Sequence, residues 1–178
     1  MNPLLKKNTL FNFYIITFSV SFFLSALSSC KEKDLRTMEQ IVKSSKETEL
    51  FFVSDTPTNP SEQIADKIYL CDYEVSSKIS ISKQQSDSLK LALLDTTNYI
   101  YDMEKKCMMM PKYAMRFQTK KDTLDIVFSD NPCAKAIANS SHIKNLVDKD
   151  KKEGVFYVDL TEKNSIIKTI EEILAVSE

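Results

Sequence analysis

The sequence divides into two unlike parts, and the first 29 residues limit what the remainder can fold into. An apolar stretch from Phe11 to Leu27 follows Lys6 and Lys7, and no acidic residue occurs before residue 30. A basic start followed by an apolar core is typical of a signal peptide. The stretch also approaches the roughly 20 apolar residues of a membrane-spanning helix, so an ordinary membrane anchor is the alternative. We expect residues 1–29 to be removed, which leaves 149 of the 178 residues for the mature fold.

The first part ends in Leu27-Ser28-Ser29-Cys30, which resembles the lipobox of bacterial lipoproteins. In that motif an apolar residue and two small residues precede a cysteine whose thiol receives a diacylglyceryl group. The resemblance implies that Cys30 begins the mature protein and carries diacylglycerol and an N-linked acyl chain such as palmitate. Each buried methylene group contributes about 0.8 kcal/mol, so several acyl chains anchor a protein firmly. No other cofactor is expected.

The residues after Cys30 bear on the location of the protein. The run Lys31-Glu32-Lys33-Asp34 resembles the export signals of surface lipoproteins in Bacteroidetes-type bacteria. Lys31 stands where an aspartate would retain a lipoprotein at the inner membrane under the enterobacterial rule. These resemblances imply a cell-envelope lipoprotein at the outer membrane, with the membrane as one partner and an envelope protein or ligand as another.

Charge and length limit the function of the mature part. Two of the 24 basic residues lie in the signal peptide, so 22 basic residues face 25 acidic residues and the formal net charge is −3. This balance lacks the basic surface that nucleic acids require, so we expect no nucleic-acid partner. The length fits one domain. We assign residues 30–48 to a lipidated tether or short amphipathic helix and residues 49–178 to a single domain.

Three patterns predict the main elements of that domain. Ser82-Lys83-Gln84-Gln85 is a capping box, which predicts a helix over residues 83–95. Apolar residues alternate with others over 113–118 and 124–128, on either side of a polar turn, and predict a hairpin with one buried face. A closing amphipathic helix is predicted by apolar residues at helical spacing, namely Ile166, Ile167, Ile170, Ile173 and Leu174.

The remaining segments complete an α+β fold. Extended segments are predicted over 50–53, 67–75, 78–81 and 155–160, and an exposed loop over Pro57 to Ser61. Helices packed on an antiparallel sheet satisfy this order of elements. We therefore expect a small antiparallel sheet with two or three packed helices.

Two residue types are too rare for several classes of enzyme. Gly154 is the single glycine, whereas phosphate-binding loops and dinucleotide motifs need several glycines. His142 is the single histidine, so metal sites and catalytic triads that use two imidazoles cannot form within one chain. We expect His142 to lie in an exposed polar loop.

Three cysteines follow Cys30, and an exported protein allows them to form disulfides. Cys107 and Cys133 are the preferred pair, because the predicted hairpin lies between them and brings its two ends together. Closing this loop would stabilise the fold by about 3 kcal/mol. Cys71 lies in an apolar segment and is interpreted as a small buried hydrophobic residue. Two free thiols at Cys107 and Cys133 are the alternative.

Two further groups of side chains could bind copper or act as an acid and a base, and each group also has a simpler structural interpretation. Thiolate and thioether ligands select Cu(I), and Cys107, Met108, Met110 and Cys133 offer both; methionines before a strand are also ordinary core residues. Acid–base pairs are available in Asp125 with Asp130 and in Glu171 with Glu172. The simpler interpretation is that these carboxylates lie on solvated faces of a strand and a helix.

A second resemblance covers about residues 85–140. The segment Lys106 to Ala114, followed by Asp125 to Phe128 and by Pro132-Cys133, resembles a pattern in uncharacterised small bacterial proteins, in which a cysteine and a proline precede a hairpin that a second cysteine closes. The resemblance implies that Cys107 and Cys133 act together, as a disulfide or as a site. It implies no known activity.

The sequence favours a noncatalytic binding or interaction module on a lipid anchor. The alternative is a thiol redox protein or a soft-metal (copper) binding protein that uses Cys107, Cys133 and the neighbouring methionines.

Overall fold

The computed structural model describes residues 38–100, 105–130, 132–140 and 155–177, all of which belong to one compact unit, Thr37–Glu178. Within these residues one eight-stranded sheet, antiparallel throughout, is combined with three α-helices. The fold is α+β, as expected, although the sheet is larger than the small one predicted. The predicted signal peptide, Cys30 and His142 lie outside the described residues. No helix among the described residues is long and apolar enough to cross a membrane.

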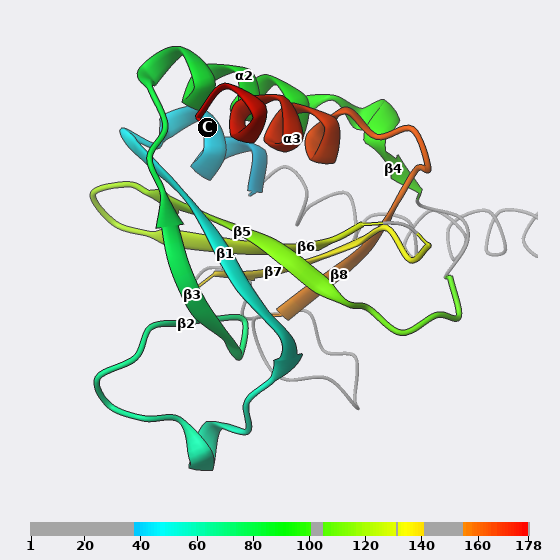
Figure 1. Cartoon of the computed structure of the whole chain (residues 1–178). Helices are drawn as coiled ribbons and strands as arrows, with labels where there is room; N and C mark the ends of the chain where they lie inside the picture. The colour runs from blue at the N-terminus through cyan, green and yellow to red at the C-terminus, as the bar shows by residue number, and fades with distance from the viewer. Residues whose placement is uncertain (1–37, 101–104, 131, 141–154, 178) are drawn as a thin grey trace, which may run out of the picture. The chain divides into compact units, whose positions relative to one another are not determined.

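The strand order across the sheet is β2-β3-β1-β5-β6-β7-β8-β4 (Figure 1). The strands are β1 Glu47–Pro57, β2 Tyr69–Leu70, β3 Tyr73–Ile79, β4 Tyr99–Ile100, β5 Pro111–Gln118, β6 Thr123–Ser129, β7 Lys135–Ser140 and β8 Val155–Leu160. The helices are residues 38–44, α2 Lys83–Leu94 and α3 Ser165–Ser177, and two 3-10 turns are η1 Pro60–Glu62 and η2 Thr96–Asn98. The predicted hairpin (β5 and β6) and the strand at 155–160 (β8) are confirmed, whereas β4 and β7 were not predicted.

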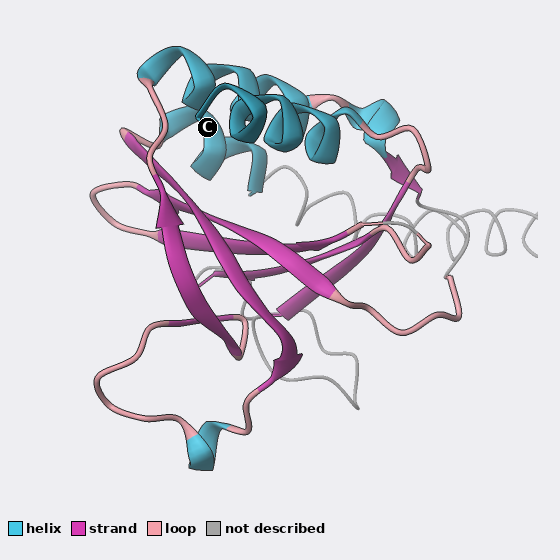
Figure 2. Cartoon of the chain, viewed as in Figure 1, coloured by secondary structure: helices cyan, strands magenta, loops and turns pink. Residues whose placement is uncertain are grey.

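The three helices lie together on one face of the sheet (Figure 2). The register of β1, β5, β6, β7 and β8 aligns one row of buried side chains across five strands, and this row faces the helices. The row consists of Leu50, Met115, Ile126, Ala138 and Phe156. Removing such apolar surface from water contributes roughly 25 cal/mol per Å², so burial of this layer stabilises the fold.

A second core lies on the opposite face and corrects one prediction. Four neighbours in register and two residues of the β2–β3 hairpin pack together there: Phe51, Ala114, Val127, Ile137, Leu70 and Tyr73. The β5–β6 hairpin is therefore buried on both faces at its centre, and the prediction of a single buried face is wrong. The reason is that the β2–β3 hairpin covers the face that the helices leave open.

A tight turn divides the segment 67–75, which was predicted as one extended stretch. Leu70 pairs with Tyr73, so only Cys71 and Asp72 lie between β2 and β3. Both have positive φ, at 49° and 71°, which is the backbone of a type I′ hairpin turn. Asparagine and glycine usually occupy these positions, because other residues pay a steric penalty there. The sequence therefore held no ordinary signal for this turn.

The helix over residues 38–44 is part of the folded unit, which therefore begins earlier in the chain than predicted. Residues 38–44 form a helix that buries Met38, Ile41 and Val42, and Lys90 of α2 donates a hydrogen bond of 2.8 Å to the carbonyl of Ser45 just after it. The helical spacing of this segment predicted a short helix. This helix belongs to the folded unit, however, so the unit begins before residue 49, where the domain was expected to start.

The two longer helices agree with their predicted signals. Ser82 and Gln85 form the capping box at the start of α2, with both reciprocal hydrogen bonds present. The apolar stripe of α3 is buried at Ile166, Ile167, Ile170 and Ile173.

A buried side chain that the sequence did not single out joins these two helices. Asn98 donates hydrogen bonds to the carbonyl of Ala92 at 2.7 Å and to Ser165 Oγ at 2.9 Å, and its Oδ1 accepts one from the Ser165 backbone at 2.7 Å. Asn98 thus links the end of α2 to the first turn of α3.

We predict that Asn98→Ala lowers the free energy of unfolding by about 2 kcal/mol, because it removes the acceptor of the part-buried Ser165 amide and leaves the Ala92 carbonyl only its longer bond from the Asp95 amide, at 3.4 Å. Urea unfolding followed by circular dichroism measures the change. Gln84→Ala, at an exposed position on α2, serves as the control and should change stability by less than about 0.5 kcal/mol. Equal stability of the Asn98→Ala variant and the parent would contradict the role given to Asn98.

Candidate functional site

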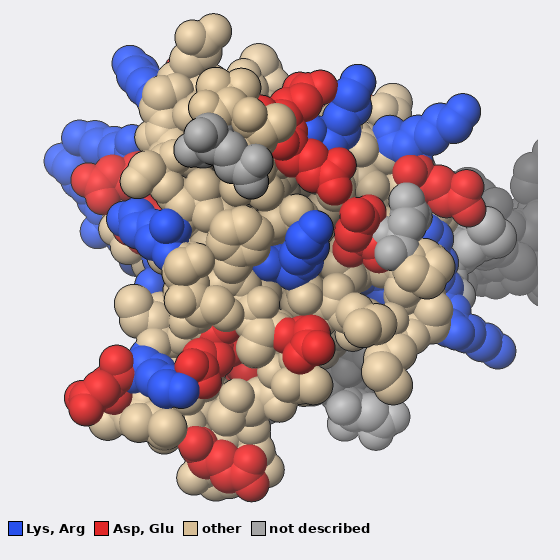
Figure 3. Space-filling view, viewed as in Figure 1, with Lys and Arg blue, Asp and Glu red and all other residues tan. Residues whose placement is uncertain are grey.

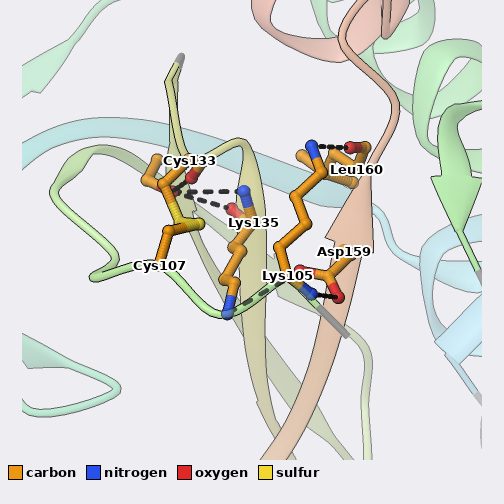
Figure 4. The surroundings of a disulfide bond; sticks show 7 residues. Lys105, Cys107, Cys133, Lys135, Asp159 and Leu160 are labelled. Carbon is orange, nitrogen blue, oxygen red and sulfur yellow. Dashed lines mark hydrogen bonds and ion pairs between the residues drawn. A yellow bond between two sulfur atoms is a disulfide. The ribbon is translucent and has the colours of Figure 1, made fainter. Parts of the chain in front are cut away.

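The cysteines predicted to act together are joined by a disulfide. Cys107 lies in the segment before β5 and Cys133 lies in the connection from β6 to β7, and their Cα atoms are 5.9 Å apart (Figure 4). Cys107 is exposed, whereas Cys133 is buried. The bond joins the segment before β5 to the connection after β6, at the open end of the β5–β6 hairpin. This is the pairing that the hairpin geometry favoured.

A buried ion pair lies beside the disulfide. Asp159 at the end of β8 accepts a hydrogen bond of 2.8 Å from the backbone amide of Lys105, and Lys135 Nζ lies 3.8 Å from its Oδ1. The ammonium group of Lys105 donates to the Leu160 carbonyl at 2.8 Å (Figure 4). A buried carboxylate requires such partners, because desolvation penalises an isolated charge. The contacts of Lys105 hold the start of the Cys107 segment against β8.

The buried hydroxyl group of Ser129 makes two further hydrogen bonds near the disulfide. Ser129 Oγ donates to the carbonyl of Cys133 and accepts from the backbone amide of Lys135 at 3.1 Å. These bonds fix the β6–β7 connection that holds Cys133. The disulfide therefore joins two segments that are each fixed by polar contacts of their own.

The candidate copper ligands do not form a sulfur cluster in this state. Cys107 and Cys133 are consumed by the disulfide, so neither offers a thiolate. Met108 and Met110 are 84% and 61% exposed, whereas Met109 packs against the core of Phe51 and its neighbours. Within the part of the chain that the structure describes, no group of three or more histidine, cysteine, aspartate or glutamate side chains is placed to hold a metal ion.

Cys71 is the free cysteine of the described residues; it is partly buried and packs against the second core. The sulfur lies 3.7 Å from the carbonyl oxygens of both Asp125 and Ile137, to which the thiol can donate. Burial raises the pKa of the Cys71 thiol far above its ordinary value of 9.0, and the nearby charges of Asp125 and Asp72 raise it further. A thiol held in its protonated form is a poor nucleophile.

The carboxylates that could have formed acid–base pairs are separated, paired with a basic side chain or exposed. Asp125 accepts two hydrogen bonds from Arg116, at 2.7 and 2.9 Å, and this contact raises the pKa of the guanidinium. Asp130 follows the other end of β6, about five residues or roughly 16 Å along an extended chain, so the two carboxylates do not share a proton. Glu171 and Glu172 are exposed on α3, as the simpler interpretation expected.

The loop between β1 and β2, residues 58–68, contains most of the predicted exposed stretch and continues to the start of β2. Its ends and centre are held by hydrogen bonds: the Thr58 amide donates to the Asp72 carbonyl at 2.8 Å, and the Ile64 amide donates to Tyr69 Oη at 3.2 Å. Gln63 Nε2 donates to Asp72 Oδ1 at 3.3 Å. Most of the loop is exposed, which confirms the expected exposure of the stretch from Pro57 to Ser61.

Two isoleucines of this loop are turned to solvent. Ile64 is 54% exposed and Ile68 is 53% exposed, and the acidic side chains of Glu62 and Asp66 beside them are exposed as well. We call these four residues the loop surface. The available signal was the presence of two isoleucines in a polar stretch without a periodic apolar partner.

Comparison with protein-family models, with curated proteins and with solved structures finds no match to this chain. The lipobox and the cysteine–hairpin pattern therefore stay predictions from the sequence.

We predict that the disulfide contributes about 3 kcal/mol to stability, because it closes a loop with a sequence separation of 26 residues. The double variant Cys107→Ala/Cys133→Ala should unfold at a lower urea concentration than the parent, and a reducing agent should shift the parent but not the variant. Alkylation in denaturant followed by mass analysis should label Cys71 before reduction and all three cysteines afterwards. Labelling of Cys107 and Cys133 without reduction would refute the bond.

The buried thiol predicts a dependence of stability on pH. The unfolded chain ionises Cys71 near its ordinary pKa of 9.0, whereas the folded chain keeps the proton, so the folded state loses stability as the pH rises above about 9. We expect the free energy of unfolding to fall more steeply with pH in the parent than in Cys71→Ala, by up to about 1.4 kcal/mol per pH unit. Urea unfolding at a series of alkaline pH values measures both slopes. Parallel slopes would show that this thiol ionises equally in both states.

Proposed function

We propose that the chain is a lipid-anchored protein of the bacterial cell envelope, whose folded unit is a noncatalytic binding module. The anchor is the acylated Cys30 of the lipobox, and the outer membrane is the favoured location.

The disulfide is the observation that carries this proposal. Structural disulfides persist in oxidising compartments outside the cytoplasm and are rare in the cytosol. Cys107 and Cys133 form such a bond, and a buried ion pair and a buried hydroxyl stiffen its surroundings. A bond of this kind supports export, which the signal peptide predicts independently.

A binding role is supported by the state of the reactive side chains. Burial keeps the Cys71 thiol protonated, Arg116 engages Asp125, and the disulfide occupies Cys107 and Cys133. The three cysteines of the described residues and Asp125 therefore have structural roles. The exposed loop surface supplies the kind of apolar contact on which binding modules rely.

We predict that Cys30→Ala abolishes incorporation of labelled palmitate and moves the protein from the membrane fraction to the soluble fraction. The reason is that the acyl chains supply the membrane affinity in this proposal. Cys71→Ala is the matched control and should keep both the label and the membrane location.

Two outcomes would contradict the proposal. Retention of the palmitate label in Cys30→Ala would show that the acyl chain is attached to another residue, which contradicts the lipobox assignment. Catalytic reduction of a disulfide substrate by the parent, lost in Cys107→Ala/Cys133→Ala, would favour the redox alternative over a binding module.

A further inference from the structure

The segment from residue 55 to residue 74 concentrates negative charge. It contains one basic residue, Lys67, and five acidic residues, Asp55, Glu62, Asp66, Asp72 and Glu74, which gives a formal net charge of −4. The mature chain as a whole carries −3, so the remainder of the mature chain carries a formal net charge of +1. Lys67 is itself engaged, because its Nζ lies 2.6 Å from Glu74. Figure 3 shows acidic side chains predominating at the bottom of the view, where Figure 1 places this loop.

Apolar side chains lie within this acidic field. Ile64 and Ile68 are each about half exposed, and they are separated by Asp66 and preceded by Glu62. An exposed apolar group with a charged rim has the composition of a protein contact site, in which the apolar centre supplies affinity and the rim selects the partner.

The loop is also held in shape before any partner arrives. Internal hydrogen bonds join the Glu62 amide to the Asn59 carbonyl at 2.8 Å and the Lys67 amide to the Ile64 carbonyl at 3.1 Å. The contacts of Thr58 and Gln63 with Asp72 fasten the loop to the β2–β3 turn. A preformed loop loses little conformational entropy on binding.

The charge of the loop surface favours a protein over a lipid surface as the occupant. The exposed acidic side chains of Glu62 and Asp66 are repelled by the negative surface of a bilayer. Basic side chains of a partner protein are attracted to them.

We propose that the loop surface is the docking site for a segment of another envelope protein that carries lysine or arginine side chains next to apolar ones. The basic side chains of the partner face Glu62 and Asp66, and its apolar side chains cover Ile64 and Ile68. This inference rests on the proposed binding function and names its surface and the chemistry of its partner.

The test is photo-crosslinking of the full chain in the cells that express it. A benzoylphenylalanine at Ala65, which lies between Ile64 and Asp66 and is exposed, reports contacts of the loop surface. We expect a crosslink to a segment of another protein in which basic residues outnumber acidic ones and apolar residues are present. The same group at Gln84 on α2 is the positional control and should not crosslink to that segment.

Substitutions then measure separately how the apolar and the acidic side chains of the loop surface contribute to the crosslink. Ile64→Ser/Ile68→Ser and Glu62→Lys/Asp66→Lys should each lower the crosslink yield by about tenfold, which corresponds to 1.4 kcal/mol. Leu91→Ser, which removes a 71% exposed apolar side chain from α2, should leave the yield unchanged. Circular dichroism and urea unfolding of each variant verify that the fold is kept, as the exposure of these side chains predicts.

The remaining outcomes overturn the proposal. A crosslink to an acidic segment, to lipid, to a second copy of this chain or to nothing would do so, as would a yield that Ile64→Ser/Ile68→Ser leaves unchanged. Cys30→Ala separates this proposal from the lipid anchor: if that variant keeps the palmitate label and the membrane location while the parent still gives the expected crosslink, the anchor fails and the docking site stands.

Discussion

The pairing of β5 with β1 and β6 is the interaction on which the other parts of the structure depend, because it builds both cores at once. Met115 pairs with Leu50 on the face that the helices cover, and Ala114 pairs with Phe51 on the face that the β2–β3 hairpin covers. A slip of one residue would exchange these two faces and place each side chain in the wrong layer. The register of three strands therefore decides where the helices pack, and it also decides where the loop after β1 emerges.

The parts of the fold that could be predicted are those in which one short segment carries its own periodicity. The capping box of α2, the isoleucine stripe of α3 and the alternation in β5 and β6 are signals of this kind. β7 carries no such signal: Ala136 and Ala138 occupy its buried positions on the helical face, and small residues there are chosen to fit large neighbours on adjacent strands. The turn at Cys71 and Asp72 lacks glycine and asparagine, so only tertiary contacts reveal it.

Some residues of the candidate site could also be predicted from a local sequence pattern, whereas others depend on the complete fold. The partnership of Cys107 and Cys133 could be inferred, because a hairpin between two cysteines brings them together whatever the rest of the chain does. The ion pair of Lys135 with Asp159 joins residues that no local pattern connects, and it depends on the pairing of β7 with β8. The sequence signal of the loop surface was two isoleucines in a polar stretch, but whether these side chains are buried or exposed depends on the complete fold.

The strand order has a consequence for self-association. Its two ends are occupied by β2 and β4, each only two residues long, and exposed side chains on the neighbouring β3 include Ser76, Ser77 and Lys78. Long, flat, apolar edges invite pairing with a second sheet, whereas short edges and an outward lysine discourage it. If the proposed lipid anchor holds this protein on a membrane, its copies meet one another more often than they would in solution. A sheet that ends in this way resists growth into a filament even where its neighbours are crowded.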